Sequence, residues 1–368
     1  MNPVTWTVQG TSDSARCGVM NTPHGAVATP AFMPVGTRGT VKGIDRDDLA
    51  ACGADIMLSN TYHLMLRPGE QVVKELGGLH DFAAWSRPIL TDSGGFQIFS
   101  LSSKVTEDGV AFRSTYDGSH LMLTPERAIQ VQEDLGSDIA MVLDVLVGLP
   151  AERAVLDDAL ERTLRWTERA VGAKRRADRA LFGIVQGGVD AELRRRSARG
   201  TASLGVAGFG IGGLSVGESA AERNAAIEAT VPELPSDKVR YVMGLGDTEG
   251  MLDAITRGID LFDCVLPTRL ARHGKVLSRD GDYSIKRTEW TSSSDPLMEG
   301  CLCFACQTYT RGYIRHLFNT KELLGLRLAT VHNLTYTLTL IADARQAILD
   351  NRYSAFAASV KSRRVRDF

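Results

Sequence analysis

The chain has 368 residues, of which 43% are hydrophobic and 23% charged, and its formal net charge at pH 7 is only −2. This composition excludes a disordered chain, and the length suffices for one large domain or two ordinary ones. Because the net charge is close to zero, a polyanionic partner would have to bind to a local basic surface.

The amino terminus reads MNPVTWTVQG and lacks the basic, then apolar, then small-residue pattern of a secretory signal. No apolar run in the chain reaches the length of a membrane-spanning helix. We therefore expect a cytoplasmic protein without a membrane partner.

Short apolar runs recur along the chain, and stretches with helical spacing follow them. One helix is well delimited, because Thr124 is a typical N-cap, Pro125 suits the first helical position and Gly136 suits the end. Apolar strands that alternate with helices predict a parallel sheet covered on both faces. The eight runs span residues 29–36, 54–63, 88–95, 138–145, 180–188, 208–217, 240–246 and 260–268.

Eight such units fit a (β/α)8 barrel, with a doubly wound open sheet as the alternative. In a barrel the active site lies at the carboxyl ends of the strands. Asp92 is ambiguous alone, since a carboxylate before Ser93, Gly94 and Gly95 is either a helix cap or a chemical group. Together the run ends indicate a functional face; they are Asn60, Asp92, Asp144, Gln186, Gly212, Gly213, Met243, Gly244 and Asp263.

Three of the six cysteines form a cluster, Cys301, Cys303 and Cys306, in the sequence CLCFAC. Cys17, Cys52 and Cys264 stand singly, as buried thiols do. The clustered thiols predict a zinc site, and a fourth protein ligand would make it structural. Either His316 or His332 could be that ligand, and the site would lie in a C-terminal subdomain of about 100 residues.

Basic residues follow directly on Asp263. The segment 269–287 carries Arg269, Arg272, Lys275, Arg279, Lys286 and Arg287, and the tail adds Lys361, Arg363, Arg364 and Arg366. Such groups beside a catalytic mouth would neutralise phosphates, although a solvated face is the simpler interpretation. Arg194, Arg195, Arg196 and Arg199 fall on a predicted outer helix and are expected to be solvated.

Several motifs in this order resemble the bacterial tRNA-guanine transglycosylase family: TDSGGFQIFSL, LFGIVQGG, GIGGLSVGE, YVMGLG, GIDLFDCVLPTR and CLCFAC with a later VHNL. The resemblance covers about residues 5 to 365. It implies an irregular (β/α)8 TIM barrel over 1–268 with an N-terminal extension. Residues 269–368 would form a zinc-binding subdomain and closing helices integrated with the barrel.

The resemblance also implies an activity. The enzyme would be a pentosyltransferase of queuosine biosynthesis that exchanges the wobble guanine of GUN-anticodon tRNAs for a 7-deazaguanine. By motif, Asp263 would be the nucleophile of a covalent enzyme–RNA intermediate and Asp92 the general acid/base. Two carboxylates of this kind suit exchange at a glycosidic bond with retention.

Further roles follow only from the resemblance. One structural zinc per subunit would be bound by Cys301, Cys303, Cys306 and His332, and the enzyme would be a homodimer. Substrate-binding residues would be Ser93, Gly94, Gly95, Phe96 (stacking on the base), Asp144, Gln186, Gly213, Leu214 and Met243. RNA-binding residues would be Gly244, Gly246, Gly250, Thr268, Arg269 and Arg272.

One departure leaves the incoming base open. After Asp144 the bacterial family has Glu-Cys-Thr-Pro, whereas this chain has Val145-Leu146-Val147-Gly148. Leu146 would replace a cysteine that faces the substituent of the deazaguanine, so both 7-aminomethyl-7-deazaguanine and queuine are expected candidates. The alternative functions are a non-catalytic tRNA-binding subunit and a zinc-dependent glycosidase or deaminase.

Overall fold

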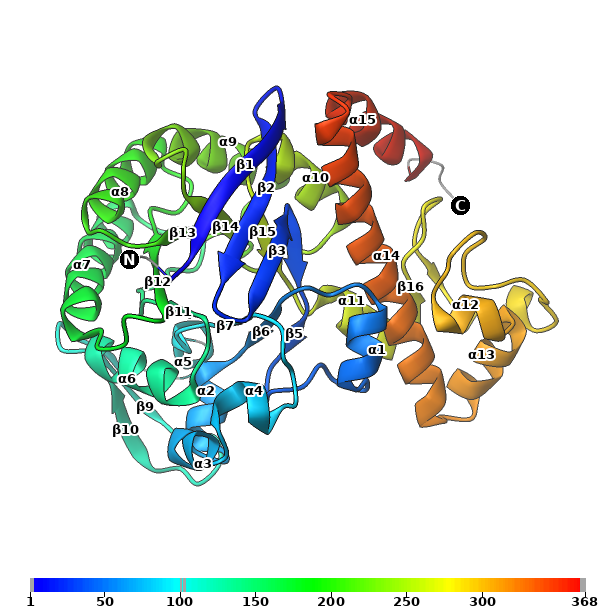
Figure 1. Cartoon of the computed structure of the whole chain (residues 1–368), viewed down its shortest axis with the longest axis horizontal. Coiled ribbons are helices and arrows are strands. Elements are labelled where there is room, and N and C mark those ends of the chain that lie inside the picture. Colours follow the sequence, from blue (N-terminus) through cyan, green and yellow to red (C-terminus); the bar gives the residue numbers. More distant parts are fainter. Residues whose placement is uncertain (1–2, 100, 102–103, 365–368) are drawn as a thin grey trace.

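A parallel barrel lies at the centre of the computed structural model, which describes residues 3–99, 101 and 104–364 (Figure 1). The strand order is β4-β15-β14-β13-β12-β11-β7-β6-β5. β4 and β5 are two halves of one barrel strand, separated by Pro34, which has no amide hydrogen to donate. Ala31 on β4 pairs with Leu261 on β15, and Val35 on β5 pairs with Leu58 on β6, so the ladder closes.

Each predicted apolar run overlaps a barrel strand. The barrel prediction is therefore confirmed, and the doubly wound alternative is wrong because the first strand, divided into β4 and β5, pairs with both β15 and β6. β12 is buried along its whole length, as expected of a parallel strand covered on both faces. The strands are β4 (Ala31–Met33), β5 (Val35–Gly36), β6 (Met57–Ser59), β7 (Ile89–Thr91), β11 (Ile139–Met141), β12 (Ala180–Val185), β13 (Gly208–Ile211), β14 (Val239–Val242) and β15 (Leu261–Asp263).

Helices surround the barrel and connect its strands. The predicted helix is confirmed as α6, where the Thr124 side chain accepts from the Arg127 amide and Gly136 takes a φ of 77°. The helices are α1 (Arg46–Ala51), α2 (Thr61–Leu66), α3 (Glu70–Glu75), α4 (Gly78–Phe82), α5 (Gly95–Phe99), α6 (Pro125–Leu135), α7 (Arg153–Ala173), α8 (Ala191–Ser203), α9 (Ala220–Thr230), the 3-10 turn η1 (Val231–Glu233), α10 (Thr248–Thr256) and α11 (Leu266–Arg272).

Two antiparallel sheets are added to the barrel. The first is formed by β1 (Thr5–Ser12), β2 (Ala15–Thr22) and β3 (Gly25–Thr29), and it covers the amino ends of the strands. There Arg16 bonds to Asp260 just before β15, and His24 bonds to Asp138 just before β11. The second sheet, β8 (Lys104–Val105), β9 (Val110–Arg113) and β10 (His120–Leu123), is inserted between α5 and α6.

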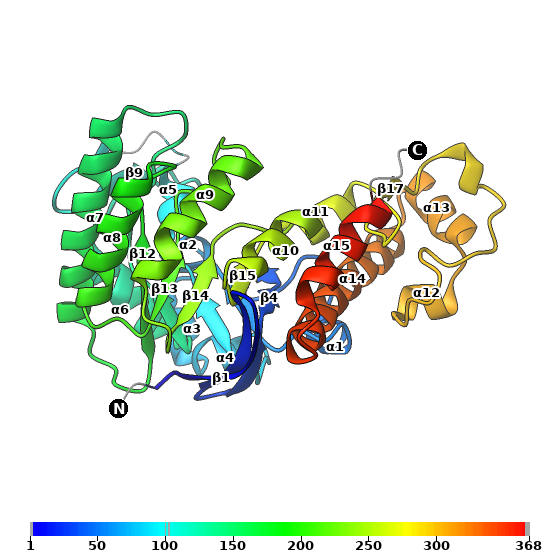
Figure 2. The ribbon, with the colours of Figure 1, turned by 90° about the horizontal axis from the view of Figure 1, so that it is seen from above.

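The C-terminal part of the chain packs beside the barrel. The long helix α14 (Leu323–Leu349) contacts α11, α12 and α13, and it lies between the barrel and the outer helices (Figures 1 and 2). The other elements are β16 (Lys275–Val276), β17 (Tyr283–Ser284), η2 (Thr288–Trp290), α12 (Phe304–Thr308), α13 (Arg311–Asn319) and α15 (Tyr353–Arg364). α11 runs across the division expected at 268/269, and Arg366 lies outside the described residues, as do 365 and 367–368.

None of the helices in the described part of the chain is both long enough and apolar enough to span a membrane.

Candidate functional site

Polar side chains from several strands meet at the carboxyl end of the barrel. Asp92 and Gln186 directly follow β7 and β12, Asp144 follows β11, and Asp263 is the last residue of β15. All four strands are parallel, so these ends share one face. Burial is the main cause that raises the pKa of Asp92, and the charge of Asp263 adds to it.

The half-buried Asp92 carboxyl group is held in one orientation by three donors. Its oxygens accept from the amides of Thr61 and Gly94, each at 3.0 Å, and from Asn60 Nδ2 at 2.5 Å. Gly94 has a φ of 79°, and a Cβ there would lie 3.0 Å from the Tyr62 amide nitrogen, so a side chain would not fit. Burial outweighs these donors and raises the pKa of Asp92 to about 7.

Asp263 is bound by a tyrosine that the sequence analysis did not identify. The buried Tyr241 hydroxyl donates to Asp263 Oδ1 at 2.5 Å, and the Gly244 amide donates to the same oxygen at 2.8 Å. Burial raises the pKa of Asp263, while these two hydrogen bonds act in the opposite direction and stabilise the ionised form. Tyr241 belongs to an entirely buried strand, β14, where sequence alone does not separate a packing residue from a functional one.

Asp144 and Gln186 form a hydrogen-bonded pair. Gln186 Nε2 donates to Asp144 Oδ2 at 2.6 Å, and burial raises the pKa of Asp144 to about 6. Gly213 has a φ of 66°, and a Cβ at this position would lie 2.3 Å from Gln186 Oε1. Only glycine therefore allows the backbone to pass this close to the pair.

The expectation of a solvated Arg194 is wrong, because its side chain is fully buried. Its guanidinium donates to four carbonyl groups at the ends of β12 and β13, those of Val185, Gly188, Gly212 and Gly213. Arg194 shares a helix face with the buried Ser197 and Thr201, and this spacing could have revealed it. Arg195 and Arg199 are exposed, as predicted.

The other residues expected to bind substrate lie at the same end of the barrel. Phe96, on α5, is 61% exposed, which leaves its ring free for contact with a ligand. Ser93 is buried and its hydroxyl accepts from the Gly95 amide. Leu214 is buried and Met243 is half-buried.

The residues expected to bind RNA differ in exposure. Gly246, Gly250 and Thr268 are buried, whereas Gly244 and Arg269 are exposed and Arg272 is half-buried. Within the described residues, no carboxylate lies within ion-pair distance of Arg269 or Arg272. Burial, and then the charge of Arg269, lower the pKa of Arg272, so α11 carries two neighbouring cations that no described carboxylate pairs with.

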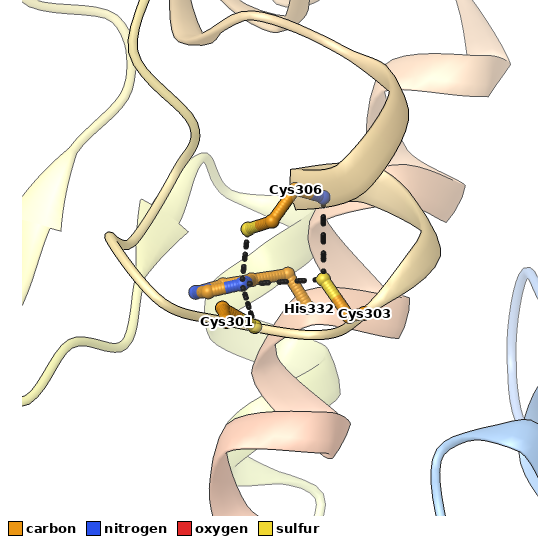
Figure 3. A group of neighbouring side chains, drawn as sticks. All are labelled: Cys301, Cys303, Cys306 and His332. Carbon is orange, nitrogen blue, oxygen red and sulfur yellow. Dashed lines mark hydrogen bonds between the residues drawn. The ribbon is translucent and has the colours of Figure 1, made fainter.

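The cysteine cluster is completed by His332 of α14 (Figure 3). His332 Nδ1 lies 3.6 Å from the Sγ atoms of Cys301 and Cys303 and 3.3 Å from that of Cys306. A sulfur and a nitrogen ligand of tetrahedral zinc lie about 3.6 Å apart, given bonds of about 2.3 and 2.0–2.1 Å. The buried cluster therefore fits zinc, whereas His316 is exposed on α13.

The second nitrogen of His332 is also fixed. Nε2 lies 2.9 Å from the Leu277 carbonyl oxygen, an acceptor that favours the proton on Nε2 and leaves Nδ1 free for a metal. The single cysteines Cys17 and Cys52 are buried, as expected, and Cys264 is half-buried.

Comparison with known proteins gives a consistent result. The family model described as queuine tRNA-ribosyltransferase matches residues 11–366. The queuine tRNA-ribosyltransferase of Herpetosiphon aurantiacus is 51% identical over 358 residues, covering 97% of this chain and 91% of that protein. The protein of the same name from Thermus thermophilus is 49% identical over 366 residues, covering 99% of this chain and 95% of that protein.

Proposed function

The chain belongs to the queuine tRNA-ribosyltransferase family of pentosyltransferases, and from this premise we propose that it exchanges the wobble guanine of GUN-anticodon tRNAs for a 7-deazaguanine. One observation supports this function most: two differently hydrogen-bonded carboxyl groups, Asp92 and Asp263, lie at the same end of the barrel as the Asp144–Gln186 pair. The reaction would be a step of queuosine biosynthesis and would take place on tRNA in the cytoplasm.

In the proposed mechanism Asp263 is the nucleophile. Its carboxylate attacks C1′ of the ribose, the bond from C1′ to guanine N9 breaks with its electron pair on the base, and Asp92 gives a proton to the departing guanine. Asp92 then takes the N9 proton of the incoming base, which attacks C1′ and releases Asp263 from its ester. Two inversions give net retention. The hydrogen bonds from Tyr241 and Gly244 favour the ionised form of Asp263 and fix the orientation of its carboxylate.

The Asp144–Gln186 pair would recognise the base. Asp144 can accept from N1–H and the exocyclic amine of a guanine ring, and Gln186 can donate to O6. An amide near Gly213 and Leu214 would add a donor, and the exposed Phe96 ring would stack on the base. A base with another donor pattern would leave these buried groups unpaired, which makes discrimination large.

We expect guanine release to fall as the pH rises through about 7, because Asp92 then loses the proton that the leaving base needs. On the acid side, release falls as Asp263 and Asp144 are protonated. Asn60→Ala removes a donor that stabilises ionised Asp92, so its pKa rises and the alkaline limb moves to higher pH. Single-turnover release of labelled guanine from tRNA measures both limbs.

Asn319→Ala, at an exposed position on α13, is the control for this shift and should leave both limbs in place. The Asn60 variant also loses the N-cap of α2, which costs about 1 kcal/mol of stability. A thermal melt therefore confirms that the variant is folded at each pH. If the alkaline limb of the Asn60→Ala variant lies at the same pH as that of the wild type, Asp92 is not the acid that protonates the leaving guanine.

The choice between 7-aminomethyl-7-deazaguanine and queuine depends on the space around the ring substituent. Leu146 is buried two positions beyond Asp144 and is proposed to limit that space. We expect Leu146→Ala to raise the use of the bulkier queuine, relative to the aminomethyl base, by roughly 10-fold or more. A competition assay that offers guanine and both bases to tRNA-loaded enzyme gives this ratio and the preferred base of the wild type.

Val147→Ala is the matched control, because Val147 is the next residue and packs between other side chains of the α7 region. Its ratio should equal that of the wild type. If Leu146→Ala also leaves the ratio unchanged, Leu146 does not face the substituent, and the two bases must be distinguished elsewhere.

Zinc, one per subunit, is proposed for the Cys3His cluster, with a structural role because four protein ligands leave no position for a reacting water. We also propose that the chain divides at 268/269 into a barrel that carries the carboxylates and a C-terminal part that carries the metal. The enzyme is proposed to be a homodimer. The alternative is a non-catalytic tRNA-binding subunit. Failure of the wild type to release guanine from tRNA that it binds would favour that alternative.

A further inference from the structure

Two arginines lie close to one tyrosine near the barrel mouth. The Arg67 Cζ atom lies 4.7 Å from the centre of the Tyr116 ring, and Arg38 Cζ lies 5.9 Å from it. Arg38 also donates to the Tyr116 hydroxyl at 3.0 Å, and His63 Nδ1 lies 3.3 Å from the same oxygen. We call Arg38, His63, Arg67 and Tyr116 the Tyr116 cluster.

The cluster is assembled from segments far apart in the chain. Arg38 follows β5, His63 lies on α2 and Arg67 caps the end of that helix. Tyr116 comes from the turn between β9 and β10, in the sheet inserted after α5. Three separate parts of the sequence therefore converge on one exposed position.

The positive charge of the cluster is not compensated. Arg38 and Arg67 are exposed, and none of the carboxylates in the described residues lies within ion-pair distance of either guanidinium. The nearby Asp117 carboxylate instead accepts from the amide and hydroxyl of Ser119, at 3.1 and 2.8 Å. On the outer surface, by contrast, Arg162 and Arg165 both pair with Glu107.

The cluster is connected to the reacting groups by a short path. The His63 amide donates to Asn60 Oδ1 at 3.0 Å, and Asn60 Nδ2 donates to Asp92. Around the barrel, β15 is followed by β4 with β5, then β6 and β7. Arg269 and Arg272 lie on α11, which follows β15, whereas the Tyr116 cluster lies next to β5 and β6.

We propose that the Tyr116 cluster binds the sugar–phosphate backbone of the tRNA on the side of the exchanged nucleotide opposite to Arg269 and Arg272. The inference rests on the proposed function for the identity of the RNA. Two exposed guanidinium groups, both positioned by contacts with Tyr116, can donate to the phosphates of a nucleic-acid backbone. A chain with a net charge of −2 needs such local sites to bind a polyanion.

The test is the salt dependence of tRNA binding by the full chain. The double variant Arg38→Gln, Arg67→Gln should bind tRNA roughly 10-fold more weakly, and the slope of log K against log salt should become shallower by about 1.4, or 0.7 per lost phosphate contact. The KM for tRNA should rise while kcat at saturating tRNA and the KM for the incoming base stay within about twofold. The double variant Arg38→Lys, Arg67→Lys keeps both positive charges, so most of the wild-type slope of log K against log salt should remain.

Arg195→Gln is the matched control, because Arg195 is equally exposed and lies on the outer helix α8. Its slope should equal that of the wild type. A slope in the double variant that matches this control overturns the cluster proposal, even if guanine exchange is intact. A changed slope with no exchange by the wild type supports the cluster and overturns the proposed function, and a wild type that does not bind tRNA overturns both.

Discussion

Replacing Asp263 by asparagine is expected to lower the rate of guanine exchange by at least about 10³-fold while tRNA binding stays within about threefold. Asparagine retains an oxygen that can accept from Tyr241 and from the Gly244 amide, so the local structure should persist. It cannot form the ester with C1′. Release of labelled guanine gives the rate, and denaturing gels of enzyme mixed with labelled tRNA show the RNA-linked protein, which should be absent in the variant.

Asp247→Asn is the matched control for this change. Asp247 is exposed in the loop after β14 and caps α10, and asparagine is an equally good N-cap. The control should exchange guanine at the wild-type rate and form the RNA-linked species. Exchange by the Asp263 variant within tenfold of the wild type would mean that the chain does not use this carboxylate as its nucleophile.

The barrel was predictable because its signal is local and repeated. Each buried strand is a short apolar run, and the polar residue after it, such as Asp92 or Gln186, marks the strand end. The break at Pro34 was not predictable, because it depends on which neighbours β4 and β5 pair with across the barrel. The inserted sheet of β8 to β10 was also missed, since its strands are short and lie outside the alternating pattern.

The site was predictable where one residue type suits one chemistry, and not where burial decides the role. The three cysteines indicate a metal by spacing. The choice of His332 over His316 depends on how α14 packs, because His332 lies on that helix, 26 residues beyond Cys306. Arg194 lies in a run of arginines that resembles a solvated face, and its burial depends on the carbonyl groups at the ends of β12 and β13 that accept from it. A local sequence pattern does not predict long-range contacts of this kind.

Replacing Cys306 by serine is expected to release the metal and to lower the melting temperature by roughly 10 °C or more. Structural zinc contributes about 10–16 kcal/mol of apparent free energy in small domains, so loss of even a third of that amount would be a large effect here. The four ligand side chains are buried, so the remaining ligands would face one another inside the protein once the ion is gone. Metal content by elemental analysis and a thermal melt measure both effects.

Loss of the metal should also weaken tRNA binding if Arg269 and Arg272 bind RNA as proposed, because α14 carries His332 and packs against α11, the helix that bears both arginines. Cys52→Ser is the matched control. Cys52 is buried, and its thiol donates to the Val331 carbonyl of α14 at 3.5 Å, a bond that serine can also make. This variant should keep one zinc per chain. If chelated protein keeps its melting temperature and its tRNA affinity but loses turnover, the ion serves the chemistry and the structural assignment is wrong.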